Sequence, residues 1–365
     1  MKKIILAILL LALGLLASWL LYFQPRGYSV AMIKDRVAFV VSGKGSKKVR
    51  AQRMMMNPNG GSSMGPSQDS QQQQQQVATE ISSLSFLENI AITAESEPVN
   101  LSFTYSNNGT LSTRQFFVSV PEGFVAAKGS STQYPVCFAF HGTAKNGASA
   151  GASAAQRACS GDIGCGCICI APVGGVTSDG ACSWNANNST TEDDLEFVQS
   201  MWNTIKDDSR IDLSRVYAYG HSVGSLFVSN ILAPQANFFT GFCCYSSQLM
   251  ESTDISNAQK PMNIVYFNGD ADPMIPFGGG SASFNKDLIF KSIQDTALAW
   301  SDHNGCSGSL ITEENDSYTE YSYDCGSSVV ASYLFKGVPH NSVEPITEYF
   351  DVSTAGLALQ LFSGS

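Results

Sequence analysis

The pentapeptide Gly220-His221-Ser222-Val223-Gly224 places the strongest constraint on how this chain folds. Residues 216–219 before it are apolar and β-prone, and residues 223–233 after it have helical spacing of apolar side chains. These patterns predict a strand, a sharp turn and a helix, with Ser222 strained at the turn and glycines where a Cβ would not fit. The Val223 N–H then begins a helix, where it can stabilise a developing oxyanion. We therefore expect a nucleophilic serine; the alternative is an ordinary glycine-rich turn of a parallel sheet.

The rest of the chain from residue 81 to 365 alternates buried strands with helices, which predicts one α/β domain with a mostly parallel sheet and helices on both faces. An antiparallel hairpin is expected first, through Asn107-Asn108-Gly109. A helix over residues 190–208 is expected to be capped by Thr190 or Thr191. The expected strands are 101–105, 114–120, 134–140, 165–171, 242–245, 262–267 and 329–335, and further helices are expected near 286–301 and 343–362.

Serine needs a histidine to take its proton, and in this topology the order along the chain is serine, acid, histidine. The chain has four histidines. His141 precedes the serine, His221 lies inside the turn with its side chain expected to point away from Ser222, and His303 follows a predicted helix as a polar cap. His340 follows the strand 329–335 in a rigid loop, so we expect His340 to be the base.

The acid is expected in the loop after the strand 262–267, which holds Asp270 and Asp272. Asp270 follows Gly269, where it can cap a turn, whereas Asp272 precedes Pro273, whose ring favours an extended and fixed backbone. We therefore expect Asp272 to be the acid. A metal site at this pair is disfavoured, because no third ligand lies near it and no calcium-loop pattern follows.

The exit of the strand 134–140 reads His141-Gly142-Thr143. A second oxyanion donor is expected there, from the backbone N–H of Thr143 or of its neighbour, unless this is a plain loop between a strand and a helix.

The N-terminal part differs from the rest in composition. Residues 4–23 form an uncharged apolar run behind Lys2-Lys3, so residues 1–26 are expected to be a signal-anchor or a cleaved signal peptide. Residues 27–80 are basic and then polar, with six consecutive glutamines, and are expected to be a disordered tether. Residues 1–53 contain ten Lys and Arg and one acidic residue, Asp35. The rest of the chain contains eleven Lys and Arg and thirty Asp and Glu, which gives it a net charge of −19. An acidic body argues against a nucleic-acid partner.

The ten cysteines favour an oxidising compartment, as do the sequons at Asn100, Asn108, Asn187, Asn188 and Asn315. Cys306 and Cys325 flank a polar loop, and Cys165, Cys167 and Cys169 share one face of a strand. For these three, buried thiols or a disulfide to Cys159 or Cys182 are favoured over zinc, which needs a fourth ligand. We expect a secreted or membrane-anchored protein with its catalytic domain outside the cytoplasm, glycosylated if the host does so.

The chain resembles the polyhydroxybutyrate depolymerase and feruloyl esterase group of α/β-hydrolases over about residues 97–345. The residues that carry the resemblance are 114–121, 134–136 leading into 140–142, 193–197, 211–217 and 220–224. The resemblance implies an α/β-hydrolase fold and a Ser222, Asp272 and His340 triad working without a cofactor. It also implies a disulfide between Cys306 and Cys325. Departures at residues 225–227 and around His340 fall on positions that line the site in relatives, so they concern the substrate.

The resemblance implies a serine carboxylesterase that acts through an acyl-enzyme, most similar to feruloyl or acetyl esterases of plant polysaccharides. A polyhydroxyalkanoate depolymerase, which cleaves a polyester, is the nearest alternative. From another class, the chain could be a catalytically inactive binding protein anchored at the surface. The complete set of Ser222, Asp272 and His340 in the expected order argues against that alternative, because a binding role does not require it.

Overall fold

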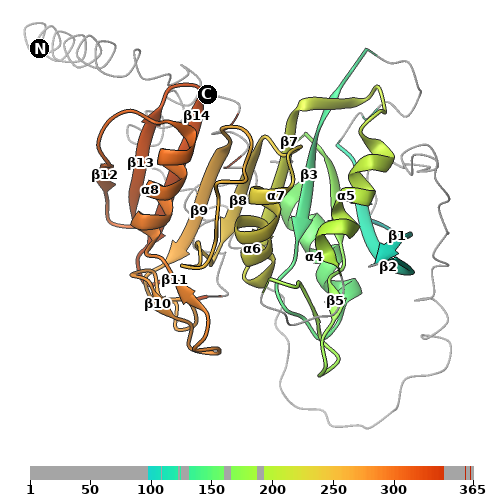
Figure 1. The fold of residues 1–365 in the computed structure, drawn as a ribbon, viewed down its shortest axis with the longest axis horizontal. Helices are drawn as coiled ribbons and strands as arrows, with labels where there is room; N and C mark the ends of the chain where they lie inside the picture. Colours follow the sequence, from blue (N-terminus) through green and yellow to red (C-terminus); the bar gives the residue numbers. More distant parts are fainter. Residues whose placement is uncertain are drawn as a thin grey trace, which may run out of the picture. The chain divides into compact units, whose positions relative to one another are not determined.

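Ten of the described strands form one central sheet (Figure 1). The computed structural model describes residues 98–107, 109–121, 124, 131–159, 166–186 and 193–340, together with Ala358 and Phe362, all within the unit that spans residues 77–363. The expected anchor (residues 1–26) and tether (27–80), and nearly all of the helix expected at 343–362, lie outside these residues. No helix in the described ranges is long and apolar enough to span a bilayer.

The strand order across the sheet is β1-β2-β4-β3-β7-β8-β9-β14-β13-β12. The six central strands, β4, β3, β7, β8, β9 and β14, are parallel to one another. At the two edges, β2 pairs antiparallel with β4 and β1, and β13 pairs antiparallel with β14 and β12. The bounds are β1 (Val99–Asn107), β2 (Thr110–Ser119), β3 (Tyr134–Phe140), β4 (Ile168–Pro172), β7 (Ile211–His221), β8 (Gly241–Tyr245), β9 (Asn263–Gly269), β12 (Ile311–Glu314), β13 (Tyr318–Cys325) and β14 (Ser328–Phe335).

Strand order reverses between β3 and β7, because the chain runs from β3 outward to β4 and then returns to the other side of β3. In open parallel sheets, ligands bind at the carboxyl ends of the strands beside such a reversal. Phe140 at the end of β3 is paired with Gly220 near the end of β7. The loop after β3 and the serine turn after β7 therefore meet at this point.

Alternating side chains divide the core between the two faces of the sheet. On one face, Phe138 of β3 packs in a large apolar cluster with residues of α5 (Asp194–Ile205), α6 (Val223–Phe227) and α8 (Ile293–Asn304), which lie in front of the sheet in Figure 1. On the other face, Cys137 and Ala139 pack in a cluster that includes Ala154 of α4 (Gly147–Cys159) and Phe362. Helices on both faces leave the central strands buried on both sides, as their continuous apolar runs predict.

The predicted strands and helices that fall within the described residues agree with the structure in type, with shifted ends. The β1–β2 hairpin pairs Asn107 with Thr110 and turns through Gly109, whose φ is +82°. Helix α5 begins at Asp194 and is capped by Asp193, whose carboxylate accepts the Glu196 N–H, so the expected cap at Thr190 or Thr191 is wrong. After α6 the helix continues as a π-helical turn η3 (Val228–Leu232) and α7 (Ala233–Gln235).

Residues 306–325 are not the expected polar loop. They contain the antiparallel strands β12 and β13, which extend the sheet beyond β14. All four residues of β12 are exposed, so this strand has no apolar alternation that would reveal it. Four further short strands lie outside the main sheet, β5 (Gly175–Val176), β6 (Cys182–Ser183), β10 (Gly280–Ser281) and β11 (Ile289–Phe290).

Candidate active site

Ser222 connects β7 to α6 in a strained turn, with φ of 53° and ψ of −121°. Backbone close approach explains the glycines on either side of it. A Cβ at Gly220 would lie 2.7 Å from the Gly224 carbonyl carbon, and one at Gly224 would lie 2.4 Å from the Phe140 carbonyl oxygen. Because the turn is this tight, only glycine fits both positions, and the serine between them adopts a backbone conformation that non-glycine residues rarely adopt.

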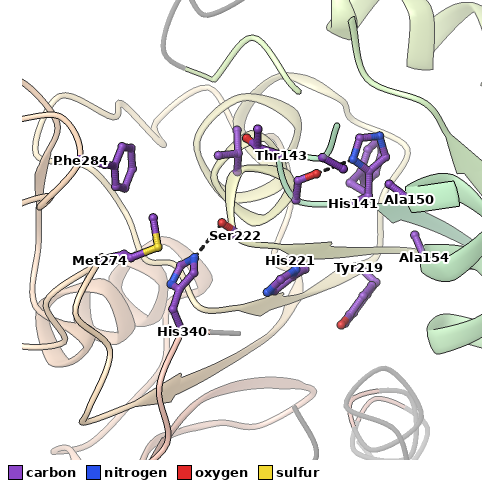
Figure 2. A pocket seen from close by; sticks show the side chains of 14 residues that line it. His141, Thr143, Ala150, Ala154, Tyr219, His221, Ser222, Met274, Phe284 and His340 are labelled. Atoms are coloured by element: carbon purple, nitrogen blue, oxygen red, sulfur yellow. Dashed lines mark hydrogen bonds between the residues drawn. The ribbon is translucent and has the colours of Figure 1, made fainter. Parts of the chain in front are cut away.

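His340 lies between Ser222 and Asp272 and contacts both side chains. The His340 Nε2 atom is 2.8 Å from the Ser222 Oγ atom (Figure 2). Its Nδ1 atom is 2.7 Å from Asp272 Oδ2. Both side chains are buried, at 5% exposure for His340 and 1% for Asp272. The other carboxylate oxygen of Asp272 accepts the backbone N–H groups of Met274 and Ile275, at 2.7 and 3.1 Å. These two bonds fix the carboxylate in the orientation in which it accepts from the imidazole.

The two aspartates of this loop have different partners. Asp270 is exposed, and its Oδ1 atom accepts the Gly337 N–H at 2.6 Å, three residues before His340. It therefore stabilises the loop that carries the histidine without contacting the imidazole. The structure places Asp272 at the imidazole, where the sequence analysis expects the acid.

Two backbone N–H groups lie beside Ser222 without an acceptor among the described residues. Val223 is the first residue of α6, and its N–H has no partner within the helix; the Thr143 N–H likewise donates to no described carbonyl. Both residues line the cavity that contains Ser222. A Cβ at Gly142 would lie 3.2 Å from the Ser222 Cβ, so the loop that carries Thr143 passes directly over the nucleophile. These are the two positions where the sequence predicts oxyanion donors.

His141 holds that loop as a neutral imidazole. Its Nε2 atom accepts the Gly174 N–H at 2.9 Å, so the proton is on Nδ1, which donates to the Gly142 carbonyl oxygen at 2.6 Å. Burial, more than any other cause, lowers the pKa of His141 from 6.5 to about 4. Its own carbonyl oxygen accepts the indole N–H of Trp184 at 2.7 Å. Three hydrogen bonds thus fix the backbone next to Thr143.

Ser246, after β8, is a site residue that the sequence analysis did not find. Its φ is +55°, and its buried hydroxyl donates to the carbonyl oxygen of His340 at 2.7 Å. With Ser222 it is one of two non-glycine residues with positive φ in the described part of the chain. No local pattern marks this serine, because its partner lies 94 residues away.

The other two histidines, His221 and His303, have different surroundings. His221 also lines the cavity, and its ring stacks on Tyr245 with centroids 5.2 Å apart. His303 lies in the last turn of α8, beside the Lys260 carbonyl oxygen at 3.2 Å, and Gly305 in the left-handed conformation ends that helix.

The cavity at Ser222 has a volume of about 460 Å³. Its described lining comes from the ends of β3 and β7 with the turns that follow them, from α4, from the segment between β9 and α8, and from the loop after β14. The lining residues are Phe140, His141, Gly142, Thr143, Ala144, Ala150, Ala154, Tyr219, His221, Ser222, Val223, Met274, Phe284 and His340. Apart from the serine, threonine, tyrosine and histidines, these residues are apolar or glycine, so the cavity suits an uncharged ligand.

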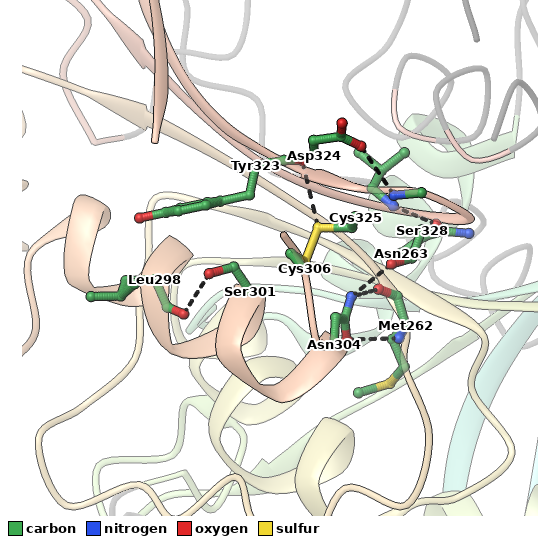
Figure 3. Close-up of a disulfide and its surroundings, with 12 residues drawn as sticks. Met262, Asn263, Leu298, Ser301, Asn304, Cys306, Tyr323, Asp324, Cys325 and Ser328 are labelled. Carbon is green, nitrogen blue, oxygen red and sulfur yellow. Dashed lines mark hydrogen bonds between the residues drawn. A yellow bond between two sulfur atoms is a disulfide. The ribbon is translucent and has the colours of Figure 1, made fainter. Parts of the chain in front are cut away.

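Cysteine pairing agrees with the implied disulfide at one place. Cys306, just after α8, is bonded to Cys325 at the end of β13 (Figure 3). Cys167 is also in a disulfide, while Cys182 carries a free thiol, so Cys182 is not its partner.

Burial raises the pKa of the Cys244 thiol to about 12. Within the described ranges, no three His, Cys, Asp or Glu side chains gather to hold a metal ion.

The sheet and the site together define a class of protein. A mostly parallel sheet with helices on both faces, and a strained serine between a central strand and its helix, are consistent with the α/β-hydrolase fold. The hydroxyl, the imidazole and the carboxylate are hydrogen-bonded in that order. In such an arrangement the serine proton can move to the imidazole, and the carboxylate keeps the imidazole in the reactive tautomer.

Comparisons with known proteins give distant similarities. No family model matches the chain. It is 28% identical over 90 residues to the protein NocK of Nocardia uniformis subsp. tsuyamanensis, which is provisionally named an esterase; the match covers 25% of this chain and 26% of that relative. The chain thus spans about a quarter of the length of this curated relative.

Similar solved structures include three with esterase or depolymerase names. Acetyl xylan esterase from Aspergillus awamori is 16% identical with a TM-score of 0.42, over 69% of this chain and 94% of that chain. An esterase from the archaeon Pyrobaculum calidifontis is 12% identical with a TM-score of 0.44, over 76% and 88%. The poly(3-hydroxybutyrate) depolymerase LpqC from Bordetella parapertussis is 15% identical with a TM-score of 0.41, over 72% and 93%.

Proposed function

We propose that this protein is a serine carboxylic ester hydrolase that works through an acyl-enzyme. The observation that carries the proposal is the 2.8 Å contact between the Ser222 hydroxyl and His340 Nε2, with Asp272 on the far side of the imidazole. A strained serine with this contact is the arrangement that nucleophilic catalysis requires, and a structural serine does not need it.

In the first half of the proposed reaction, Ser222 Oγ attacks the ester carbonyl carbon while its proton moves to His340 Nε2. The carbonyl oxygen becomes an oxyanion that accepts the N–H groups of Val223 and Thr143. The bond between the carbonyl carbon and the alcohol oxygen then breaks, and the imidazolium gives its proton to that oxygen. Asp272 stabilises the imidazolium throughout and keeps its own charge. The alcohol leaves, and the acyl group stays on Ser222.

In the second half, a water molecule replaces the alcohol. His340 takes one proton from the water as its oxygen attacks the acyl carbon, the bond to Ser222 Oγ breaks, and the imidazolium returns the proton to the serine. The carboxylic acid leaves, and the enzyme is restored. No cofactor enters either half of this scheme.

Two substrate classes follow from the sequence resemblance, feruloyl or acetyl esters of polysaccharides and hydroxyalkanoate polyesters. The apolar lining of the cavity favours the polyester, whose units are uncharged and carry few hydroxyl groups. A catalytically inactive binding protein has less support, because such a protein gains nothing from a strained serine held against a paired imidazole. The proposed location, outside the cytoplasm on an anchor or after secretion, rests on residues 1–80 and on the cysteines.

The test is hydrolysis of a panel of p-nitrophenyl esters, methyl ferulate, acetylated xylan and a polyester film, by the wild-type chain and by Ser222→Ala. We expect turnover of at least one class, with a burst of nitrophenol when deacylation is slower than acylation, and loss of nearly all turnover in the variant. Absence of turnover with every ester, or an active Ser222→Ala variant, would refute the proposal.

A further inference from the structure

The cavity beside Ser222 has two unlike sides. Figure 2 shows Met274 and Phe284 on the side of the serine hydroxyl where His340 lies, and helix α4 on the opposite side. The described lining residues of helix α4 are both alanines, Ala150 and Ala154. The large apolar side chains and the small ones therefore face different parts of a substrate that is attached at Ser222.

Met274 and Phe284 lie in the segment between β9 and α8 that also carries the acid. The Met274 N–H donates to Asp272 Oδ1 at 2.7 Å, and the Met274 carbonyl oxygen accepts the Ser283 N–H at 2.9 Å. Phe284 follows Ser283 directly in the chain. Two hydrogen bonds thus connect the Asp272 carboxylate to the backbone that carries Met274 and Phe284. The positions of these two residues are therefore fixed relative to the catalytic groups.

The direction of proton transfer decides which part of the ester these side chains meet. In acylation, the proton on His340 Nε2 passes to the oxygen of the leaving alcohol, so that oxygen must lie on the His340 side of Ser222. The acyl group projects away from the imidazole, toward α4. Met274 and Phe284 therefore lie where the alcohol part of the ester is bound.

The chemistry of this side favours an apolar alcohol. Phe284 is 44% exposed and Met274 is half-buried, so both have apolar surface that a ligand can cover. None of the described lining residues of the cavity is Asp, Glu, Asn, Gln, Lys or Arg, and the Thr143 hydroxyl is already bonded to Ser183 at 2.9 Å. A sugar alcohol bound against Met274 and Phe284 would lose water from its hydroxyl groups without gaining hydrogen-bond partners from these two apolar side chains, which costs binding free energy.

We propose that Met274 and Phe284 form the binding wall for the leaving alcohol, and that this wall selects esters of apolar alcohols over esters of sugar hydroxyls. The apolar class includes alkyl and benzyl alcohols and the hydroxyalkanoate units of a polyester. The inference rests on the proposed ester hydrolysis at Ser222 and specifies which side of that substrate is recognised, and by which residues.

The test uses two ester series. One keeps the butyryl group and varies the alcohol from methyl to hexyl, benzyl and glyceryl; the other keeps the ethyl alcohol and varies the acyl chain. For the wild-type chain, kcat/KM should rise about two- to fourfold for each added methylene of the alcohol that contacts the wall. Phe284→Ala and Met274→Ala should flatten this rise and lower kcat/KM for the hexyl ester by about tenfold, while the methyl ester changes by less than about threefold.

Phe277→Ala is the matched control, because Phe277 lies on the same loop, is 39% exposed and does not line the cavity. We expect it to leave both series unchanged. Since the alcohol has left before deacylation, the wall variants should not alter the deacylation rate of a shared butyryl-enzyme. They should reduce capture of that acyl group by added 1-butanol relative to water, because the accepting alcohol uses the same wall.

Three results would overturn the inference while leaving the proposed function intact. They are equal losses for all alcohols, flattening of the acyl series in place of the alcohol series, or better hydrolysis of glyceryl than of hexyl esters by the wild-type chain. Failure of the proposed function itself would appear differently, as no turnover of any ester in either series.

Discussion

Asp270 accepts the Gly337 N–H at 2.6 Å, while Asp272, two residues later, accepts from His340. The exposed aspartate thus stabilises the backbone of the loop that carries His340, and the buried one orients the imidazole. The two positions make a matched pair, because they share one loop and one side-chain chemistry.

We expect Asp272→Asn to lower kcat by at least about a hundredfold, because an amide cannot keep the imidazole in the reactive tautomer. Asp270→Asn should lower kcat by less than about tenfold, since an amide oxygen can still accept the Gly337 N–H. Steady-state kinetics of both variants, with circular dichroism to show that they fold, make the comparison. The reverse order of losses would assign the acid to Asp270.

Ser246 is expected to act as a positioning residue for His340. Ser246→Ala removes the hydrogen bond to the His340 carbonyl oxygen, which should cost about 1 kcal/mol of stability and several-fold in kcat, with KM little changed. The control is Ser247→Ala, because Ser247 is equally buried and its hydroxyl points to Gln248. Equal losses of kcat in the two variants would show that Ser246 has no special relation to the histidine.

Burial of His141 makes stability depend on pH. Its pKa is about 4 in the folded chain and 6.5 in the unfolded chain, so the unfolded state binds more protons between these values. The stabilisation, of order 3 kcal/mol, is fully present above pH 6.5 and is lost as the pH falls toward 4. Urea unfolding of the wild-type chain and His141→Asn at pH 7.5, 5.5 and 4.5 measures it. The variant should lose less stability on acidification; identical pH dependence would contradict this account.

The disulfide between Cys306 and Cys325 should contribute to stability without taking part in catalysis. It closes a segment with a sequence separation of 19 residues, so replacing both cysteines by serine should cost about 3 kcal/mol. At 25 °C kcat should change by less than about twofold. Cys182→Ser, which removes a free thiol, is the control for loss of a cysteine. Differential scanning calorimetry that shows equal Tm values for the wild-type chain and the double variant would refute the prediction.

The sequence predicts the parts of this structure that depend on local patterns. The turn at Ser222, the buried strands and the placement of Asp272 and His340 at strand exits follow from glycine sterics, apolar runs and chain order. The strands β12 and β13 were missed because β12 is exposed along its length and has no apolar face. The role of Ser246 could not be predicted, because its partner His340 lies far away in the sequence. The role of His141 could not be predicted either, because it depends on a distant partner, Gly174, and on burial of the imidazole.

The cap of α5 shows a smaller limit of the same kind. Thr190, Thr191 and Asp193 are all good N-caps by residue type, so the sequence alone does not choose among them. In the structure the Asp193 N–H donates to the Asn107 side chain, and the next residue, Asp194, pairs with the buried Arg114. These long-range contacts determine where the helix begins.

The central claim is that Ser222 is an activated nucleophile, and labelling with a fluorophosphonate ester probe tests it most directly. The account predicts one covalent label per chain, located on the peptide that contains Ser222 by mass spectrometry. The label should be absent in Ser222→Ala, strongly slowed in His340→Gln, and unchanged in the control Ser252→Ala, which removes an exposed serine outside the cavity. A wild-type chain that folds and stays unlabelled, or a label that persists in Ser222→Ala, would contradict it.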